Sequence, residues 1–370
     1  MTWVPESDAI APLLDDCAGG YRLTEPEVAL LLRAKGRDVL AVAAAADRAR
    51  EERVGETVTW VRNQNINVTN VCINRCGFCG FSRREGEPEA FRLSLEDVAR
   101  KAREAAARRV TEICTVSGLA PDFDGDTYCA ILRACREGAP GVHLHASNPM
   151  EVAYGAARSG RTTEEQLLLM REAGLGSLCG TAAEILVDEV RARICPGKCS
   201  SAEWARVIVE AHRLGIPTTA TIMYGSGESV EERARHLAIL REIQDETGGF
   251  TEFVPLSFIH HQTPLFLEGR APAGATGRED LLMVAVARLF LDNVDHVQAS
   301  WVKLGVKMAA ISLIAGADDL GGTMFEERIS AGAGATGTDY LAPEEMARIA
   351  SDLGRPFSQR TTLYEPVLSG

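Results

Sequence analysis

The stretch NVCINRCGFCGF, residues 70–81, decides the fold expected for this chain. Its three cysteines have the spacing C-x3-C-x2-C on a loop that follows an apolar, strand-like run. Three thiolates can hold three irons of a cubane iron–sulfur cluster, but a cubane has four. The fourth iron is then free to bind a molecule that is not protein, and an open metal position is typical of a catalytic site. The stretch therefore predicts Cys72, Cys76 and Cys79 as cluster ligands.

A structural zinc site and a disulfide are the alternatives for these cysteines. Structural zinc takes four protein ligands, usually as two pairs. The next cysteine is Cys114 and the first histidine is His143, so no fourth ligand follows nearby. A disulfide would leave one cysteine unpaired, and residues 1–8 (MTWVPESD) are acidic and contain Pro5, unlike a secretory signal. The cluster is the favoured interpretation.

Composition restricts the class of function. A formal net charge of −13 argues against nucleic acid as a partner, because phosphate binding needs a basic surface. No apolar run is long enough to span a membrane, so no membrane partner is expected. Ten cysteines without a secretory signal predict a reducing, cytoplasmic location.

From residue 63 onward, short apolar runs alternate with helical patterns, as in parallel βα units. This alternation predicts an α/β fold, a (β/α)8 TIM-type barrel. Residues 1–62 are expected to form a helical N-terminal extension that contains the capping-box pattern Thr24-Glu25-Pro26-Glu27, and residues 63–370 the barrel with a C-terminal segment. The expected strands are 66–71, 112–116, 142–146, 176–179, 218–223, 253–258, 297–301 and 322–325.

Polar groups follow several of these expected strands, where the catalytic loops of such barrels lie. They are Ser117-Gly118, His143, His145, Ser147-Asn148, Thr181, Glu184 and Tyr224. His143 and His145 have the same parity on their strand, so both are expected to face inward, with one of them a satisfied core histidine.

The cysteine motif resembles that of the radical S-adenosylmethionine (SAM) superfamily, and further segments resemble one group within it. The group contains CofH, MqnE and MqnC, and the likeness, which covers about residues 39–364, is closest to CofH. The segments are 65–72 (NINVTNVC), 180–186 (GTAAEIL), 194–198 (ICPGK), 247–256 (TGGFTEFVPL), 298–305 (QASWVKLG) and 359–364 (QRTTLY).

The resemblance implies a [4Fe-4S] cluster whose open iron chelates SAM and releases a 5′-deoxyadenosyl radical. It also implies a 5-amino-6-(D-ribitylamino)uracil–L-tyrosine 4-hydroxyphenyl transferase, subunit 2 of FO synthase in deazaflavin (FO, coenzyme F420) biosynthesis. The Cα–Cβ bond of L-tyrosine would break, and the 4-hydroxybenzyl group would be transferred to the ribitylaminouracil. A CofG-like partner enzyme would close the third ring, and flavodoxin or ferredoxin would be the external electron donor.

Residue roles follow from this resemblance and from position at strand ends. Phe78 is expected against the adenine of SAM, and Ser117 and Gly118 at its methionyl amine. Glu184 is expected to bind ribose hydroxyls or a substrate amine. His145 would accept a proton or bind the ribityl chain, and Tyr224 would bind a substrate hydroxyl or amine. Each also has a structural alternative, such as loop packing or a core position.

A looser set of cysteines and several departures from the group leave alternatives open. Cys179, Cys195 and Cys199 are expected to be buried thiols rather than ligands of a second cluster. Substitutions in VSGLAP (116–121), HASNP (145–149), CGTAAE (179–184) and YGS (224–226) all fall at strand ends, which favours a paralogue with another substrate as one alternative. An aminofutalosine-synthase-like enzyme and a non-catalytic barrel with a structural metal site are the others.

Overall fold

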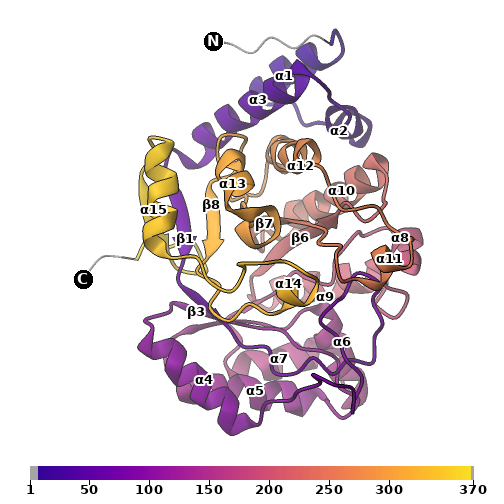
Figure 1. Ribbon diagram of the computed structural model, residues 1–370, viewed down its shortest axis with the longest axis vertical. Coiled ribbons are helices and arrows are strands. Elements are labelled where there is room, and N and C mark those ends of the chain that lie inside the picture. The colour runs from indigo at the N-terminus through magenta and orange to yellow at the C-terminus, as the bar shows by residue number, and fades with distance from the viewer. Residues whose placement is uncertain (1–6, 368–370) are drawn as a thin grey trace.

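Parallel strands form the centre of the protein, and the structure, a computed structural model, describes residues 7–367 (Figure 1). Six strands pair in the order β2-β3-β4-β5-β6-β7 and three in the order β8-β1-β9. Every one of these pairings is parallel. The strands of the described residues are β1 (Val58–Val61), β2 (Asn63–Asn65), β3 (Glu112–Thr115), β4 (His143–Ala146), β5 (Ser177–Leu178), β6 (Thr218–Tyr224), β7 (Phe250–Ser257), β8 (Asp319–Gly322) and β9 (Phe357–Arg360).

Isolated parallel bridges join the two sheets into a barrel. Val297 bridges to Phe253 of β7, and Gln298 bridges to Asp319 of β8. Gln64 of β2 bridges to Phe325, beyond the end of β8, and so completes the ring. Residues 297–298 thus occupy the seventh position between β7 and β8. The α/β barrel expected from the sequence is confirmed.

Three expected strands differ from the structure. Residues 66–71 do not continue a regular strand, because the chain leaves the wall after β2, and Thr69 and Val71 bridge to Arg92 and Arg83 instead. Residues 297–301 supply only the two bridges, since α13 begins at Trp301. The eighth strand lies at Asp319–Gly322, before the expected 322–325.

Helices surround the barrel (Figure 1). The capping box at Thr24 is present, with the Thr24 backbone N–H donating to Glu27 Oε2 at 2.7 Å. The helices within residues 7–367 are α1 (Ile10–Ala18), α2 (Glu25–Leu32), α3 (Arg37–Val54), α4 (Leu95–Ala107), α5 (Gly125–Gly138), α6 (Pro149–Arg158), α7 (Thr163–Ala173), α8 (Asp188–Ile194), α9 (Ser201–Arg213), α10 (Val230–Thr247), α11 (Pro264–Leu267), α12 (Gly277–Phe290), α13 (Trp301–Ser312), α14 (Ile329–Gly332) and α15 (Pro343–Asp352).

The N-terminal helices lie together at one end of the molecule, with α3 and α2 against α12 and α10 (Figure 1). Arg278 and Arg241 tie them to the barrel by donating to the carbonyls of Ala34 and Leu23. Strand β1 follows α3 and pairs with β8 and β9, so residues 58–61 belong to the sheet rather than to the helices. The division of the chain at residue 62 stays a prediction.

Residues 1–6, on which most of the N-terminal signal argument depends, lie outside the described residues. Between residues 7 and 367, no helix combines the length and the apolar composition that crossing a membrane requires.

Candidate active site

The loops at the carboxyl ends of the strands and the inward-facing strand residues enclose one cavity of about 400 Å³. Residues of the cysteine loop and of the strand-end loops line its rim, and residues within the strands line its interior. The predicted site residues that line it are Cys72, Cys76, Phe78, Cys79, Ser117, Gly118, His145 and Glu184. Segments more than a hundred residues apart in the sequence therefore share one chamber.

Backbone hydrogen bonds hold the cysteine loop against two neighbouring segments. The Gly77 N–H donates to the Ile194 carbonyl at 2.8 Å, and the Gly77 carbonyl accepts from the Leu265 N–H at 2.8 Å. A Cβ at Gly77 would lie 2.6 Å from Leu265 Cγ, so this close approach requires glycine. The Leu119 N–H donates to Cys72 Sγ at 3.4 Å. The loop thus has a fixed backbone that presents its thiols to the cavity.

Burial controls the protonation of these thiols. It raises the pKa of Cys72 and, more strongly, that of Cys76, although Lys198 opposes both shifts. Metal binding would reverse this preference, because a coordinated thiol loses its proton. Within residues 7–367 no group of three or more His, Cys, Asp or Glu side chains is arranged so that it could hold one metal ion. Such an arrangement is not needed where each thiolate binds a different iron, so the donor set fits a cubane.

Glu151, on the first turn of α6, is one of the cavity residues with unmet hydrogen-bonding capacity. Its Oε1 accepts the Ser117 N–H at 3.0 Å, and its buried Oε2 has no partner among residues 7–367. Burial raises the pKa of Glu151 to about 8, despite the opposing effect of the Ser117 N–H. A carboxylate beside Ser117 can accept an N–H of the methionyl amine of SAM, so the residues present fit this cofactor.

Gly118 has a packing role in the structure itself. A Cβ there would lie 2.3 Å from the carbonyl oxygen of Val71, just before Cys72. Glycine therefore lets the loop after β3 approach the cysteine loop closely.

An ion pair lies next to the cysteine loop. Lys198 Nζ donates to Glu184 Oε1, and it lies 5.2 Å from the centroid of the Phe78 ring. Burial lowers the pKa of Lys198, but Glu184 together with the nearby Cys76 and Cys195 outweighs burial and leaves the net pKa above its ordinary value. The predicted Glu184 therefore acts as one half of a charged pair beside the predicted Phe78.

The interior of the cavity is polar. His145 Nδ1 shares a 2.7 Å hydrogen bond with Ser177 Oγ, and burial lowers the pKa of His145 to about 4. His145 is therefore neutral at ordinary pH. Glu252 accepts from the Tyr364 O–H at 2.7 Å and lies 3.4 Å from Arg360. This end offers neutral hydrogen-bonding groups and compensated charges.

Tyr224 is the predicted residue that the structure does not place in the cavity. Its fully buried O–H donates to Asp280 Oδ1 at 2.8 Å, on α12. Side chains alternate along β6, where Thr221 and Met223 face the cavity, so Tyr224 points outward to the helices. The catalytic expectation for Tyr224 is corrected on this ground. His143 likewise lies outside the cavity lining, bonded to Ser177 Oγ at 2.8 Å.

Sequence reasoning missed several residues of the cavity. Glu151, Lys198, Lys303 and Arg360 all line it. Three of them stand within segments that carry the family resemblance: Lys198 in 194–198, Lys303 in 298–305 and Arg360 in 359–364. Their place in these segments was a signal that could have identified them as site residues. Glu151 gave none, because an acidic residue in the first turn of a helix is common for structural reasons. Cys179 also faces the cavity, while Cys195 and Cys199 are buried elsewhere.

A three-cysteine loop after the first strand of a parallel barrel defines a radical SAM protein, and residues 66–240 match the family model of the radical SAM superfamily. Residues 247–365 match the CofH/MqnC C-terminal region. The chain therefore belongs to the CofH group of radical SAM enzymes.

Its relatives include two proteins named 5-amino-6-(D-ribitylamino)uracil–L-tyrosine 4-hydroxyphenyl transferase. That of Methanosphaerula palustris is 64% identical over 95% of this chain and 97% of its own length. That of Methanoculleus marisnigri is 65% identical over 95% and 96%. A longer protein of Nocardia farcinica, named FO synthase, is 44% identical over 97% of this chain and 42% of its own length.

Solved structures support the fold. The hydrogenase maturase HydG of Carboxydothermus hydrogenoformans has a TM-score of 0.74 at 18% identity, covering 96% of this chain and 80% of that one. Methylornithine synthase, PylB, has a TM-score of 0.70 at 19% identity, covering 94% and 97%.

Proposed function

We propose that the protein is a radical SAM transferase that breaks the Cα–Cβ bond of L-tyrosine and transfers its 4-hydroxybenzyl group to 5-amino-6-(D-ribitylamino)uracil. The observation that carries this proposal is the 64% identity over 97% of the Methanosphaerula palustris transferase, which bears that name. The product would be the precursor of the deazaflavin chromophore FO.

We further propose Cys72, Cys76 and Cys79 as the ligands of a [4Fe-4S] cluster that binds SAM. When bound, the pair supplies a 5′-deoxyadenosyl radical. Glu151 and the Ser117-Gly118 segment would hold the methionyl amine of SAM, and Phe78 would offer an apolar face to its adenine. The loop bonds of Gly77 and the unpartnered Glu151 Oε2 support this assignment.

The two substrates differ in polarity, and the cavity wall differs in the same way. A ribityl chain and a pyrimidine ring need hydroxyl and amide partners, whereas a phenol ring needs an apolar surface. His145 and Glu184 are polar residues of the cavity wall, and we propose that both bind substrate. Other polar residues of the lining include Asn63, Asn65, Asn67, Glu112, Thr219, Thr221, Glu252, Gln298 and Arg360. The apolar lining residues include Phe81, Met150, Met223, Val254, Leu256, Phe258 and Ile329.

A CofG-like enzyme is the proposed partner that closes the third ring. The FO synthase of Nocardia farcinica supports this proposal, because this chain matches only 42% of its length and leaves room for a second activity. An external one-electron donor, flavodoxin or ferredoxin, is the second proposed partner. All ten cysteines are unpaired, which supports a proposed cytoplasmic location.

The sequence differences from the CofH group at the strand ends leave two alternatives to test: a paralogue with another substrate and an aminofutalosine-synthase-like enzyme. The test uses anaerobically reconstituted protein with SAM, dithionite, L-tyrosine and the ribitylaminouracil, and detects products by mass spectrometry. We expect the coupled product, 5′-deoxyadenosine and glyoxylate from the hydrolysed glycine imine. Formation of 5′-deoxyadenosine without coupled product would remove the transferase assignment and favour another substrate.

A further inference from the structure

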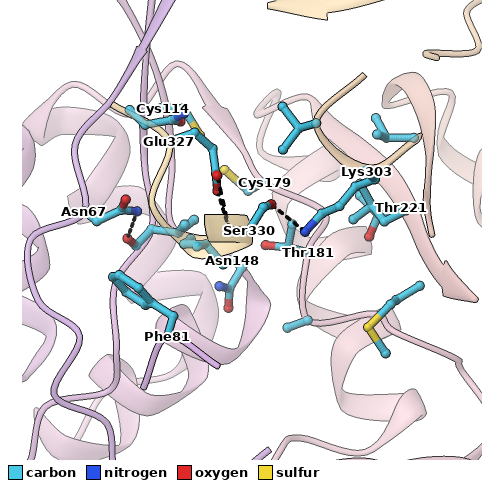
Figure 2. A pocket seen from close by; sticks show the side chains of 18 of the residues that line it. Asn67, Phe81, Cys114, Asn148, Cys179, Thr181, Thr221, Lys303, Glu327 and Ser330 are labelled. Atoms are coloured by element: carbon cyan, nitrogen blue, oxygen red, sulfur yellow. Dashed lines mark hydrogen bonds between the residues drawn. The ribbon is translucent and has the colours of Figure 1, made fainter. Parts of the chain in front are cut away.

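Lys303 is a third cation in the cavity lining, beside Lys198 and Arg360. It lies on the first turn of α13, and its Nζ donates to Ser330 Oγ at 2.7 Å (Figure 2). Protein surrounds the side chain, and the surface that it keeps accessible faces the cavity. The ammonium is therefore directed at whatever fills that space.

Among the described residues Lys303 forms no direct ion pair, and the Glu327 carboxylate acts on its charge only from beyond 4.0 Å. Among the described residues its one hydrogen-bond partner is a neutral hydroxyl, and no carboxylate oxygen lies within 4.0 Å of its Nζ. Lys198 differs, because Glu184 pairs with it directly. An ammonium has three N–H donors, and a buried charge without a partner is costly. An anionic ligand would remove that cost.

The position of Lys303 in the ring separates it from the SAM side. Glu151 follows β4, the third strand counted from β2, whereas α13 follows residues 297–298, which occupy the seventh position. The two lie on opposite sides of an eight-membered ring. Ser117 lies on the side of Glu151, whereas the cysteine loop also approaches α14, where a Cβ at Gly80 would lie 2.2 Å from the Gly332 carbonyl oxygen. The α-carboxylate of SAM shares a carbon with the amine that we place at Glu151, so a ligand carboxylate at Lys303 is best supplied by the second molecule in the cavity.

We propose that Lys303 binds the α-carboxylate of the amino-acid substrate. This inference rests on the proposed function, in which tyrosine carries a carboxylate and the ribitylaminouracil carries no anionic group. The ammonium would fix the carboxylate end, which orients the amine and the Cα–Cβ bond within the chamber. Lys303 is thus a substrate-binding residue that recognises an amino acid rather than an amine.

The Ser330 bond offers a purely structural alternative. Ser330 lies on α14, and its N–H donates to Glu327 Oε1 at 2.9 Å, so Lys303 could serve only to fasten this segment over the cavity (Figure 2). Such a fastening role would not distinguish substrates with and without a carboxylate. Substrate discrimination therefore separates the two roles.

The experiment compares L-tyrosine with tyramine, which lacks the carboxylate, in Lys303→Met and wild-type enzyme under anaerobic turnover. We expect the wild type to favour tyrosine by roughly 30-fold or more in kcat/KM, the loss typical of one unmatched buried charge. In Lys303→Met the tyrosine KM should rise by a similar factor, the preference should fall to within about threefold, and the KM for SAM should stay unchanged.

Two matched variants complete the test. Ser330→Ala removes the fastening bond but keeps the ammonium, so it should retain the tyrosine preference. Lys307→Met makes the same substitution at an exposed position of α13 and should behave as wild type. Equal loss of preference in Ser330→Ala, or a raised SAM KM with unchanged tyrosine KM in Lys303→Met, would overturn the inference alone. Wild-type protein that makes no coupled product would overturn the proposed function and the inference together.

Discussion

Glu151 accepts the Ser117 N–H at 3.0 Å with one carboxylate oxygen and keeps the other buried without a partner in the described part of the chain. The pair joins the first turn of α6 to the loop after β3, beside the cysteine loop. A carboxyl group with a pKa raised by burial to about 8 can lose its proton when a ligand N–H donates to it.

The affinity for SAM should depend on pH through Glu151. The carboxylate is the form that accepts an N–H of the methionyl amine with both oxygens available, and below its pKa of about 8 the group is mostly protonated. Affinity should therefore rise as pH increases from about 6.5 toward 8 and level off above that value, by at most about tenfold per pH unit. The SAM concentration dependence of 5′-deoxyadenosine formation measures this.

Glu151→Gln should weaken SAM binding by roughly 10- to 100-fold and remove that pH dependence, because an amide carries no charge. Glu164→Gln, at an exposed glutamate in the first turn of α7, is the matched control and should change neither. An unaltered pH profile in Glu151→Gln would show that another group titrates.

Single replacement of Cys72, Cys76 or Cys79 by alanine should abolish a stable cluster. We expect about four irons per wild-type chain and a severe loss in each variant, since each thiolate holds one iron. Iron and sulfide analysis with visible absorption checks this. Cys17→Ser, on α1, should keep the full iron content. About eight irons in the wild type would instead reveal a second cluster.

Arg360 should contribute strongly to stability. It is 3% exposed, and its Nε lies 2.5 Å from Asp319 Oδ2 while an amino group lies 3.4 Å from Glu252. Arg360→Met leaves buried carboxylates uncompensated, which should lower the free energy of unfolding by about 3–5 kcal/mol. Urea denaturation of the cluster-free protein measures it. Arg348→Met, at an exposed position of α15, should leave the free energy of unfolding at the wild-type value. Equal effects of the two substitutions would contradict the prediction.

Tyr224→Phe should affect stability rather than catalysis. It removes the 2.8 Å hydrogen bond to Asp280, and both partners are shielded from water. We expect a loss of about 1–3 kcal/mol in the free energy of unfolding, with kcat/KM within about twofold of wild type. A large fall in kcat/KM at unchanged stability would show that Tyr224 acts in catalysis, despite its outward position on β6.

Local sequence patterns predicted the barrel and most of its strands. The run 218–223 is fully buried in β6, as an apolar run in a parallel sheet should be. Residues 66–71 were misassigned, because an apolar, β-rich run reports burial and not the partner strand. In the structure this run pairs with residues 83 and 92, which lie in the same loop after β2.

Spacing along the chain by itself predicted Cys72, Cys76 and Cys79 as cluster ligands, because neighbouring residues on one loop are a local property. Tertiary structure alone decided the rest of the chamber. Tyr224 and Met223 are adjacent in sequence but face opposite sides of β6. Lys198 and Glu184 form their ion pair only because the helix between them, α8, brings them together. Lys303 and Glu151 enter the same cavity from opposite positions in the ring. Strand register and ring closure, which depend on contacts between distant segments, fix such encounters, and no local pattern encodes them.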